Sequence, residues 1–288
     1  LIRKHLTDSR WREVFLLTAS LLDDATAFVS MMQSTIASII ADAPNARQFL
    51  TWAYYRTRQA NVSIEQCRTV QLAYILLVRA LAFERSSERN LEKALLRTID
   101  LVRASEEEGA LIQSFEHTRS LVQDRERALD LQQALRLALA LARSTTPLVG
   151  FDYCLYYSWA YTTLFTFAAT ELNPKWQAAM WQLPNLIEGV AGLANEAGLP
   201  HLAQCLTIKS CPLPNAHVRD WQEYADTLWA ILRDERDLCR EWNFNNAEVG
   251  KLSNYFYANE LLVQFLKVAV VSDRQAVLNN LLLPPKSE

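Results

Sequence analysis

Apolar residues recur at intervals of three and four positions along almost the whole chain. The pattern is clearest near the start, at Trp11, Val14, Phe15, Leu17 and Leu21. This spacing puts the apolar side chains on one face of a helix, whereas a half-buried strand would alternate with a period of two. The sequence therefore predicts an all-α protein, an irregular bundle or array of roughly ten or more helices.

Candidate helix caps fall in phase with these apolar stripes. Three pairs of polar residues stand three positions apart just before an apolar run: Ser63 and Gln66, Asn245 and Glu248, and Ser272 and Gln275. In such a capping box each side chain accepts a hydrogen bond from an N–H group that the first turn leaves unpaired. We expect a helix to begin at each pair. The same pattern predicts a helix capped by Asn45 and a long helix from about Val218 to Arg240.

Turn-forming residues divide the chain near its middle. The clearest break is the Ser-Thr-Thr-Pro sequence at residues 144–147, with Gly150 shortly after it. Clusters of such residues between periodic segments are typical of loops and domain boundaries. We therefore expect a helical N-terminal subdomain at 1–146 and an aromatic-rich helical C-terminal subdomain at 147–288.

Residues 151–172 form the most apolar segment of the chain and are long enough to cross a bilayer as a helix. Asp152, Ser158 and Glu171 interrupt the apolar run, as do four threonines. Such polar and charged residues are unfavourable in a membrane-spanning helix. The segment therefore predicts a buried helix of a protein that does not enter a membrane.

Glycine is scarce, with 6 residues in a chain of 288. Average usage of about 7% would give roughly 20. Such a low number argues against a sandwich or barrel with many tight turns, and none of the six has the spacing of a phosphate-binding loop or a dinucleotide turn. No Gly-x-Ser-x-Gly elbow and no His-Glu-x-x-His motif is present either. We expect no nucleotide, no cofactor and no catalytic residue in this chain.

Charge and cysteine content point to an ordinary cytoplasmic protein. The formal net charge is −3, so the sequence offers no general attraction to nucleic acid or to an anionic membrane. The five cysteines are scattered and odd in number, which favours reduced thiols over a disulfide framework. No signal peptide is recognisable, and the start at Leu1 rather than Met suggests a piece of a longer protein.

A metal site is the main chemical alternative. The candidate ligands are His201, Cys205, Cys211 and His217. Structural zinc sites usually join two close ligand pairs across a longer stretch, and these four residues do not form two such pairs. Buried thiols and surface imidazoles are the favoured interpretation, and no metal is expected.

Aromatic residues crowd one part of the C-terminal half. The most prominent are Tyr153, Tyr156, Tyr157, Trp159, Trp176 and Trp181. Large aromatic side chains bury much apolar area, so core packing is the favoured interpretation. The alternative is an aromatic surface that contacts a partner, because Trp and Tyr are enriched at interface hot spots. The six residues are the candidate interaction surface.

Both ends of the chain resemble a known family. Residues 5–19 read HLTDSRWREVFLLTA, and Trp242-Asn243-Phe244 is followed by Tyr255, by residues 258–263 and by Leu-Leu-Leu-Pro at 281–284. These segments resemble the C-terminal part of bacterial, especially cyanobacterial, NACHT NTPases. Phe49-Leu50-Thr51-Trp52, the run 128–142 and the helix around Trp159 agree more loosely. The chain departs from the family at Asn245, where a Ser or Thr cap is usual.

The resemblance implies a role in signal transduction. NACHT proteins are STAND ATPases with an N-terminal effector, a central ATPase that binds ATP and Mg²⁺, and a C-terminal sensor or regulatory region. The chain would be that last region: a non-catalytic helical domain that controls the upstream module in cis and responds to a trigger, for which a protein is one candidate. Bacterial members are linked to antiphage defence. Trp11 and Arg12 would adjoin the ATPase, because the chain enters there.

Two other classes of function stay open from the sequence. One is an enzyme or binding domain that holds a metal or a small ligand in a helical pocket, for which His201 and Cys205 would be the first residues to test. The other is an oligomerisation scaffold without a ligand.

Overall fold

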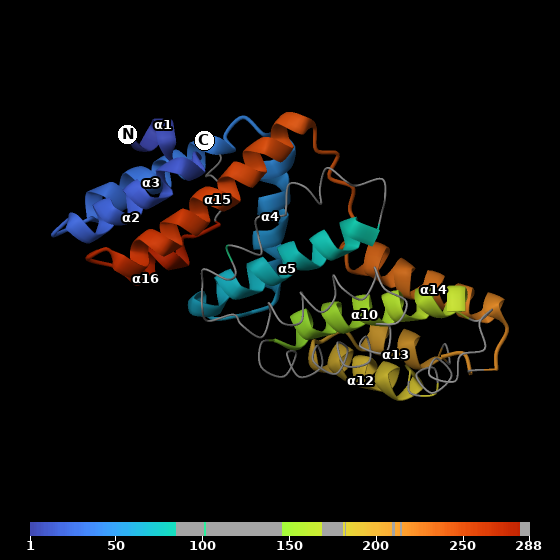
Figure 1. Ribbon diagram of the computed structural model, residues 1–288. Helices are drawn as coiled ribbons and strands as arrows, with labels where there is room; N and C mark the ends of the chain where they lie inside the picture. The colour runs from blue at the N-terminus through green and yellow to red at the C-terminus, as the bar shows by residue number, and fades with distance from the viewer. Residues whose placement is uncertain are drawn as a thin grey trace. The chain divides into compact units, whose positions relative to one another are not determined.

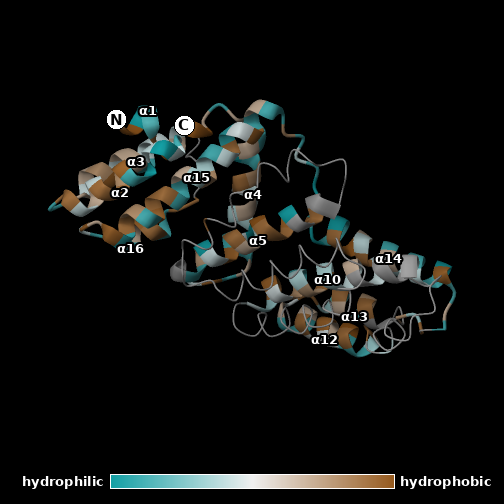
Figure 2. Ribbon diagram, viewed as in Figure 1, coloured by the Kyte–Doolittle hydropathy of each residue, from teal (hydrophilic) through white to brown (hydrophobic). Residues whose placement is uncertain are grey.

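The computed structural model describes residues 1–84, 101, 146–168, 181, 183–208, 211–213 and 215–282. Every regular element in these ranges is helical: they contain eleven α-helices, one 3-10 turn and one π-helical turn, and no strand (Figure 1). Figure 2 shows hydrophobic and hydrophilic segments alternating along the helices. The all-α prediction is confirmed.

The chain forms two compact units. Unit 1 combines Leu1–Ile112 with Glu241–Glu288, and unit 2 is Gln113–Arg240. Both termini therefore lie in unit 1 (Figure 1). This division differs from the boundary expected at residues 146 and 147. Turn residues mark where a helix stops, but they do not show that the last part of the chain returns to pack on the first.

Unit 1 is built around its last long helix. The elements in its described residues are α1 (Ile2–His5), η1 (Ser9–Trp11), α2 (Arg12–Leu21), α3 (Thr26–Ile39), α4 (Pro44–Gln59), α5 (Ile64–Glu84), α15 (Asn246–Val268) and α16 (Arg274–Asn279). Helix α15 packs against α2, α3 and α4, and α16 packs against α5. A helix with neighbours on several sides must be apolar around most of its circumference. The buried side chains of α15, from Leu252 to Leu266, fit this requirement.

Aromatic rings connect α15 to the first helices. The Phe28 ring of α3 stacks on the Phe265 ring at 5.1 Å between centroids, and Phe15 of α2 meets Phe28 edge-on at 6.1 Å. A second link joins the loops: Ala25 N–H donates to the Val270 carbonyl at 2.8 Å. Offset and edge-on aromatic pairs stabilise beyond the area that they bury. The two ends of the chain thus share one core.

The described residues of unit 2 form α10 (Pro147–Ala168), α12 (Leu183–Glu196), α13 (Pro200–Ile208), α14 (Val218–Ala230) and the π-helical turn η4 (Ile231–Glu235). Helix α10 packs against both α12 and α14, and α12 packs against α13. The sequence predicted α10 as a buried helix, and most of its side chains are buried. Among the helices that the structure describes, α10 included, none combines the length and hydropathy needed to cross a membrane.

The observed N-termini of the helices test the predicted capping boxes. The Asn245 and Glu248 box is confirmed, with Glu248 N–H donating to Asn245 Oδ1 at 2.9 Å. Of the capping box at Ser63, the structure gives one of the two hydrogen bonds: the Ser63 N–H donates to Gln66 Oε1 at 3.4 Å. Asp273, not Ser272, caps α16, because its carboxylate accepts from Ala276 N–H at 2.8 Å.

Two other predictions about helix ends are wrong. Helix α4 begins at Pro44, so Asn45 lies inside its first turn instead of capping it. Proline suits this place because the first turn needs no N–H from it. The long helix predicted for residues 218–240 ends earlier: α14 stops at Ala230, η4 follows, and Asp237 has a φ of +46°.

Candidate interaction surfaces

Three tyrosines of the aromatic segment lie in the core of unit 2. Tyr153, Tyr156 and Tyr157 of α10 are each at most 1% exposed. Their rings contact one another, with centroids 5.3 Å apart for Tyr156 and Tyr157 and 6.4 Å apart for Tyr153 and Tyr157. Core packing is therefore the role of these three side chains, and a partner cannot reach them without opening the unit.

The tryptophans of the same segment are more accessible. Trp159 is half-buried, and its ring lies 4.7 Å from the ring of Trp229 on α14. Trp181 is 62% exposed. Trp176 lies outside the described residues. Among the described candidates, Trp159 and Trp181 are the ones that a partner could contact.

A buried ion pair lies beside the tyrosines. Asp152 of α10 is completely buried, and Arg236, just after η4, is nearly so. Arg236 Nε donates to Asp152 Oδ1 at 2.6 Å and Nη2 donates to Oδ2 at 3.0 Å. A bidentate pair of this kind fixes the guanidinium plane against the carboxylate. The sequence showed Asp152 only as a charge in an apolar run, and no local signal pairs it with a residue 84 positions away.

Trp11 and Arg12, the expected contact with an upstream module, are held by unit 1 itself. The Trp11 ring stacks on His5 with centroids 3.9 Å apart. Arg12 Nε donates to Gln264 Oε1 of α15 at 2.9 Å, and its guanidinium also pairs with Glu13. Both side chains are partly exposed. Their positions are therefore fixed, with one side of each left free to meet another surface.

Two sequence segments that carry the family resemblance meet in unit 1. The Trp242 ring lies 5.1 Å from Phe49 and 5.5 Å from Trp52, and the Phe244 ring lies 6.0 Å from Phe49. Phe49 and Trp52 belong to α4, and all four side chains are buried. We call these four residues the aromatic cluster. The stretch before α15 is thus anchored in α4, about 190 positions earlier.

One carboxylate caps two helices next to this cluster. Glu248 Oε2 accepts from the N–H of Asn245, at the start of α15 (3.3 Å), and from Asn45 Nδ2 (3.0 Å). Its Oε1 accepts from the N–H of Asn45 in the first turn of α4 (2.8 Å). First-turn N–H groups have no partner inside their own helix, so each needs an acceptor from elsewhere. The sequence predicted the cap of α15 but not its second role at α4.

Replacing Glu248 with alanine is expected to lower the free energy of unfolding by about 1–3 kcal/mol, because first-turn donors of two helices lose their acceptor. Urea unfolding followed by circular dichroism measures the change. Glu241→Ala removes an exposed carboxylate from the same unit and serves as the control. Equal losses in the two variants would contradict the double cap.

The four candidate metal ligands have other environments. The described residues contain no group of three or more His, Cys, Asp or Glu side chains placed to hold a metal ion. His201 Nε2 lies 3.7 Å from the Glu235 carboxylate. His217 Nδ1 accepts from Arg219 N–H at 3.2 Å at the start of α14. Burial raises the pKa of the Cys211 thiol to about 12 and also raises that of Cys154, which opposes the thiolate that a metal needs.

Thiol alkylation is expected to follow these environments. Cys205 is exposed on α13 and should react first with iodoacetamide at about pH 8. A thiol with a pKa of about 12 is ionised in only about one molecule in ten thousand at that pH, so Cys211 should react far more slowly. Peptide mass spectrometry over time measures both rates. Cys205→Ser should remove the fast phase, and modification of Cys211 at the rate of Cys205 would contradict the expectation.

Comparison with known families identifies the last part of the chain. Residues 207–284 match the family model NCH2, NACHT C-terminal Helical domain 2. No curated protein and no solved structure matched the chain. The chain therefore carries a NACHT-associated C-terminal helical domain. The match covers about a quarter of the sequence and includes α14, the aromatic cluster residues Trp242 and Phe244, α15 and α16.

Proposed function

We propose that this chain is the regulatory and sensor part of a NACHT-type signal-transducing ATPase of bacteria. The observation that carries the proposal is the match of residues 207–284 to a NACHT C-terminal helical domain. A domain of this kind accompanies an upstream NACHT module in the same protein. ATP and Mg²⁺ would bind in that module, and this chain would contribute no catalytic group and no cofactor. Its role would be to restrain the ATPase until a trigger binds.

Such control requires two states of the whole protein. A trigger shifts the balance between a closed and an open state only as far as it binds one of them more tightly. Two surfaces support this mechanism. The side of unit 1 that carries Trp11 and Arg12 would contact the ATPase in the closed state. The half-buried Trp159 and the exposed Trp181 of the aromatic segment would meet the trigger or a partner.

The restraint is tested in the full-length protein by Arg12→Glu. This charge reversal should weaken the closed state and raise ATP hydrolysis without a trigger by about fivefold or more, the range of a typical coupling between two sites. Arg58, exposed on α4, provides the control Arg58→Glu. Unchanged basal hydrolysis in Arg12→Glu, with the protein folded, would overturn the assignment of this surface.

The sensing surface is tested by Trp181→Glu. The full-length protein, expressed in a bacterial host, should lower the plating efficiency of at least one bacteriophage in a panel, and the variant should lose this protection. Tyr55→Glu is the control, because it changes a side chain of the same exposure, 62%, on unit 1. This variant should still protect the host against the phage. Protection that survives Trp181→Glu would remove this tryptophan from the sensing surface. Absence of any protection would remove the role in antiphage defence.

A further inference from the structure

Helix α16 is attached to unit 1 mainly by the two residues that lie close behind it. None of its six residues is buried, whereas Leu281 and Leu282 are. We call residues 274–282, which comprise α16 and these leucines, the C-terminal strap. A segment with few buried contacts opens at a lower free-energy cost than the core of a domain. The strap is therefore a part of unit 1 that can detach when its two leucines are released.

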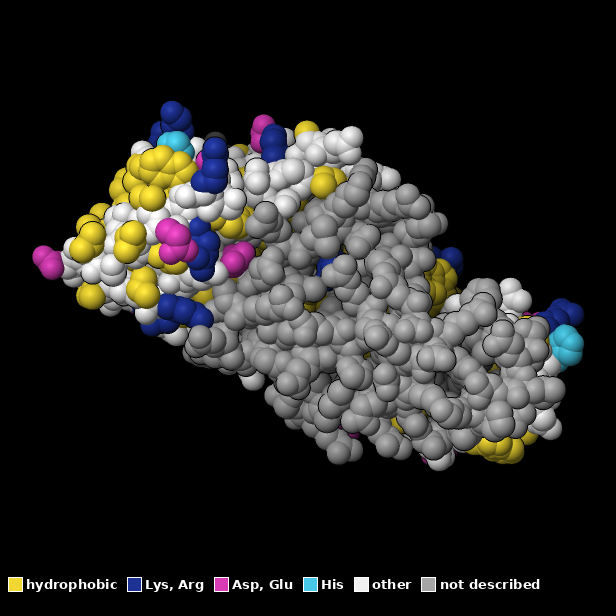
Figure 3. All heavy atoms as spheres, in the orientation of Figure 1, with side chains coloured by type: hydrophobic (Ala, Val, Ile, Leu, Met, Phe, Trp, Pro, Cys, Tyr) yellow, Lys and Arg dark blue, Asp and Glu magenta, His cyan; other side chains and the backbone are white. Residues whose placement is uncertain are grey.

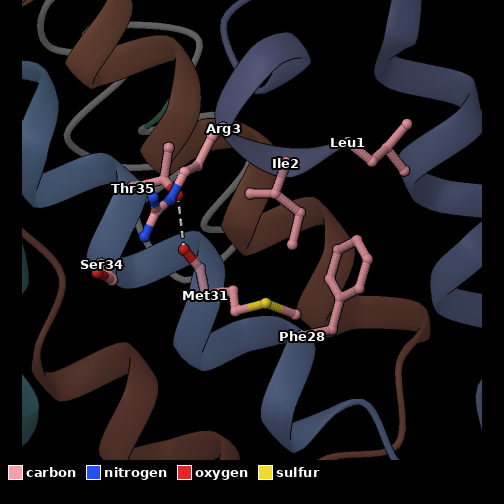
Figure 4. A pocket seen from close by; sticks show the side chains of 7 residues that line it. All are labelled: Leu1, Ile2, Arg3, Phe28, Met31, Ser34 and Thr35. Carbon is pink, nitrogen blue, oxygen red and sulfur yellow. Dashed lines mark hydrogen bonds between the residues drawn. The ribbon is translucent and has the colours of Figure 1, made fainter.

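Helix α1, which is also short, is attached in another way. Its four residues include Ile2, which is buried. Figure 4 shows the Ile2 side chain pointing toward Phe28 and Met31 of α3. Helix α1 is thus anchored by a side chain of its own, whereas the anchor of α16 lies outside the helix.

The backbone of this anchor is strained at Leu282. Its φ is +63°, in the left-handed region that a bulky side chain disfavours, because the Cβ comes too close to a carbonyl oxygen. The Leu282 carbonyl accepts a hydrogen bond from Nε2 of Gln71, a buried side chain of α5, at 2.9 Å. Such a conformation persists only where the surroundings hold it. Release of the strap relieves this strain and so costs less than the burial of two leucines alone would require.

The place that the two leucines fill beside Gln71 is a built site for a short peptide, and we call it the leucine site. Two adjacent apolar side chains are buried there, and the Gln71 amide binds one main-chain carbonyl. A buried amide donor without an acceptor is costly, so an emptied site favours any segment that supplies the same groups. The observed occupant is the Leu281-Leu282 sequence of the chain itself. The same sequence of a second copy therefore meets every requirement of the site.

The loop between α15 and α16 also favours a second copy as the occupant. Val268 and Val270 are each more than half exposed, and Ala269 between them has an extended backbone. Figure 3 shows hydrophobic side chains on the surface at this end of unit 1. The Ala25 N–H donates to the Val270 carbonyl, which fixes the start of the loop on unit 1 and leaves the strap beyond it free to swing. Residues 268–271 read Val-Ala-Val-Val, and β-branched residues favour an extended conformation.

We propose that the leucine site also binds Leu281 and Leu282 of a second copy of the chain, so that two copies exchange their C-terminal straps. Exchange of an identical element is a low-cost route to a dimer, because the contacts within one chain form again between two. Gln71 of each copy would donate to the Leu282 carbonyl of the other. The two extended loops would run past each other and cover Val268 and Val270. The proposal does not depend on the regulatory function, because it uses only contacts within unit 1.

The length of the loop provides the first test. Deleting Val271 and Ser272 from the full 288-residue chain leaves too few residues for the strap to turn back onto its own unit, and short loops promote exchange. This variant should be dimeric at a concentration where the unchanged chain is mostly monomeric. Adding Leu281→Asp and Leu282→Asp to the deletion should restore the monomer, because an unpaired carboxylate is costly to bury. Light scattering coupled to size-exclusion chromatography measures the mass, and circular dichroism checks folding.

Peptide binding provides the second test. The full chain with Leu281→Asp and Leu282→Asp should have an empty leucine site and bind a fluorescent peptide of residues 272–282. The unchanged chain should bind this peptide far more weakly, because its own strap competes. Adding Gln71→Met, which removes the amide donor, should weaken binding about fivefold to tenfold. Adding Gln48→Met, at an exposed position of α4, should leave the affinity unchanged.

Three results would overturn the exchange. The first is a folded deletion variant that stays monomeric, and the second is a dimer that persists after both leucines are replaced by aspartate. The third is a peptide that fails to bind the emptied site or binds it equally well with Gln71→Met. If the deletion variant does not fold, the peptide measurement decides alone.

Discussion

Replacing Arg236 with alanine is expected to lower the free energy of unfolding of unit 2 by about 3–5 kcal/mol, the range found when one partner of a buried ion pair is removed. The Asp152 carboxylate is completely buried and receives two hydrogen bonds from this guanidinium, at 2.6 and 3.0 Å. Without Arg236 the buried charge of Asp152 loses its bidentate partner. Urea unfolding, followed by tryptophan fluorescence, measures the loss.

A double variant separates the pair from simple loss of packing. Asp152→Asn combined with Arg236→Met removes both charges and keeps much of the volume. Because an apolar or neutral replacement of a buried pair is often tolerated, this variant should be clearly more stable than Arg236→Ala. If the double variant were as unstable as the single one, the expected cost of burying the Asp152 carboxylate without Arg236 would be contradicted.

The second large effect is expected for Trp242→Ala, which should lower the free energy of unfolding of unit 1 by about 3–5 kcal/mol. The Trp242 side chain is 3% exposed and lies within 5.5 Å of two rings of α4, between ring centroids. Its removal leaves a large cavity inside the aromatic cluster and weakens the anchor of the segment before α15. Urea unfolding followed by circular dichroism measures the change.

Two variants control for this effect. Trp242→Phe keeps a ring in the cluster and should lose markedly less stability. Tyr55→Ala removes an exposed aromatic side chain of α4 and should change the free energy of unfolding by at most about 0.5 kcal/mol. A small loss in Trp242→Ala, close to that of Tyr55→Ala, would show that the cluster does not stabilise unit 1.

Helical periodicity was sufficient to predict the fold class, because a helix that buries one face carries apolar residues at intervals of three and four positions. The residues at which helices begin and end were harder to predict from the sequence. Asn245 and Glu248 interact within one turn and were predicted, whereas the end of α14 has no such local cause. Neither glycine nor proline lies between Val218 and Arg240. The chain leaves the helix there as Arg236 pairs with Asp152, and Asp237 takes a left-handed conformation that Asp tolerates better than most residues.

The candidate interaction surfaces could also be predicted only in part from the sequence. The sequence identified the aromatic residues of the C-terminal half, but it could not separate the buried Tyr153 and Tyr157 from the exposed Trp181. Periodicity gives little help on α10, since neighbours pack on more than one side of it.

The order in which the two units appear along the chain has a consequence for synthesis on the ribosome. Unit 1 needs Glu241–Glu288, and the residues of unit 2 must be translated first. At about 5–20 residues per second, translating residues 113–240 takes on the order of 6–26 s. During this time helices α2–α4 lack α15, so Phe28 and Phe49 remain without Phe265 and Trp242. Nascent chains are therefore expected to depend on chaperones during this interval, and a ribosome stalled before Glu241 would expose an unfinished core.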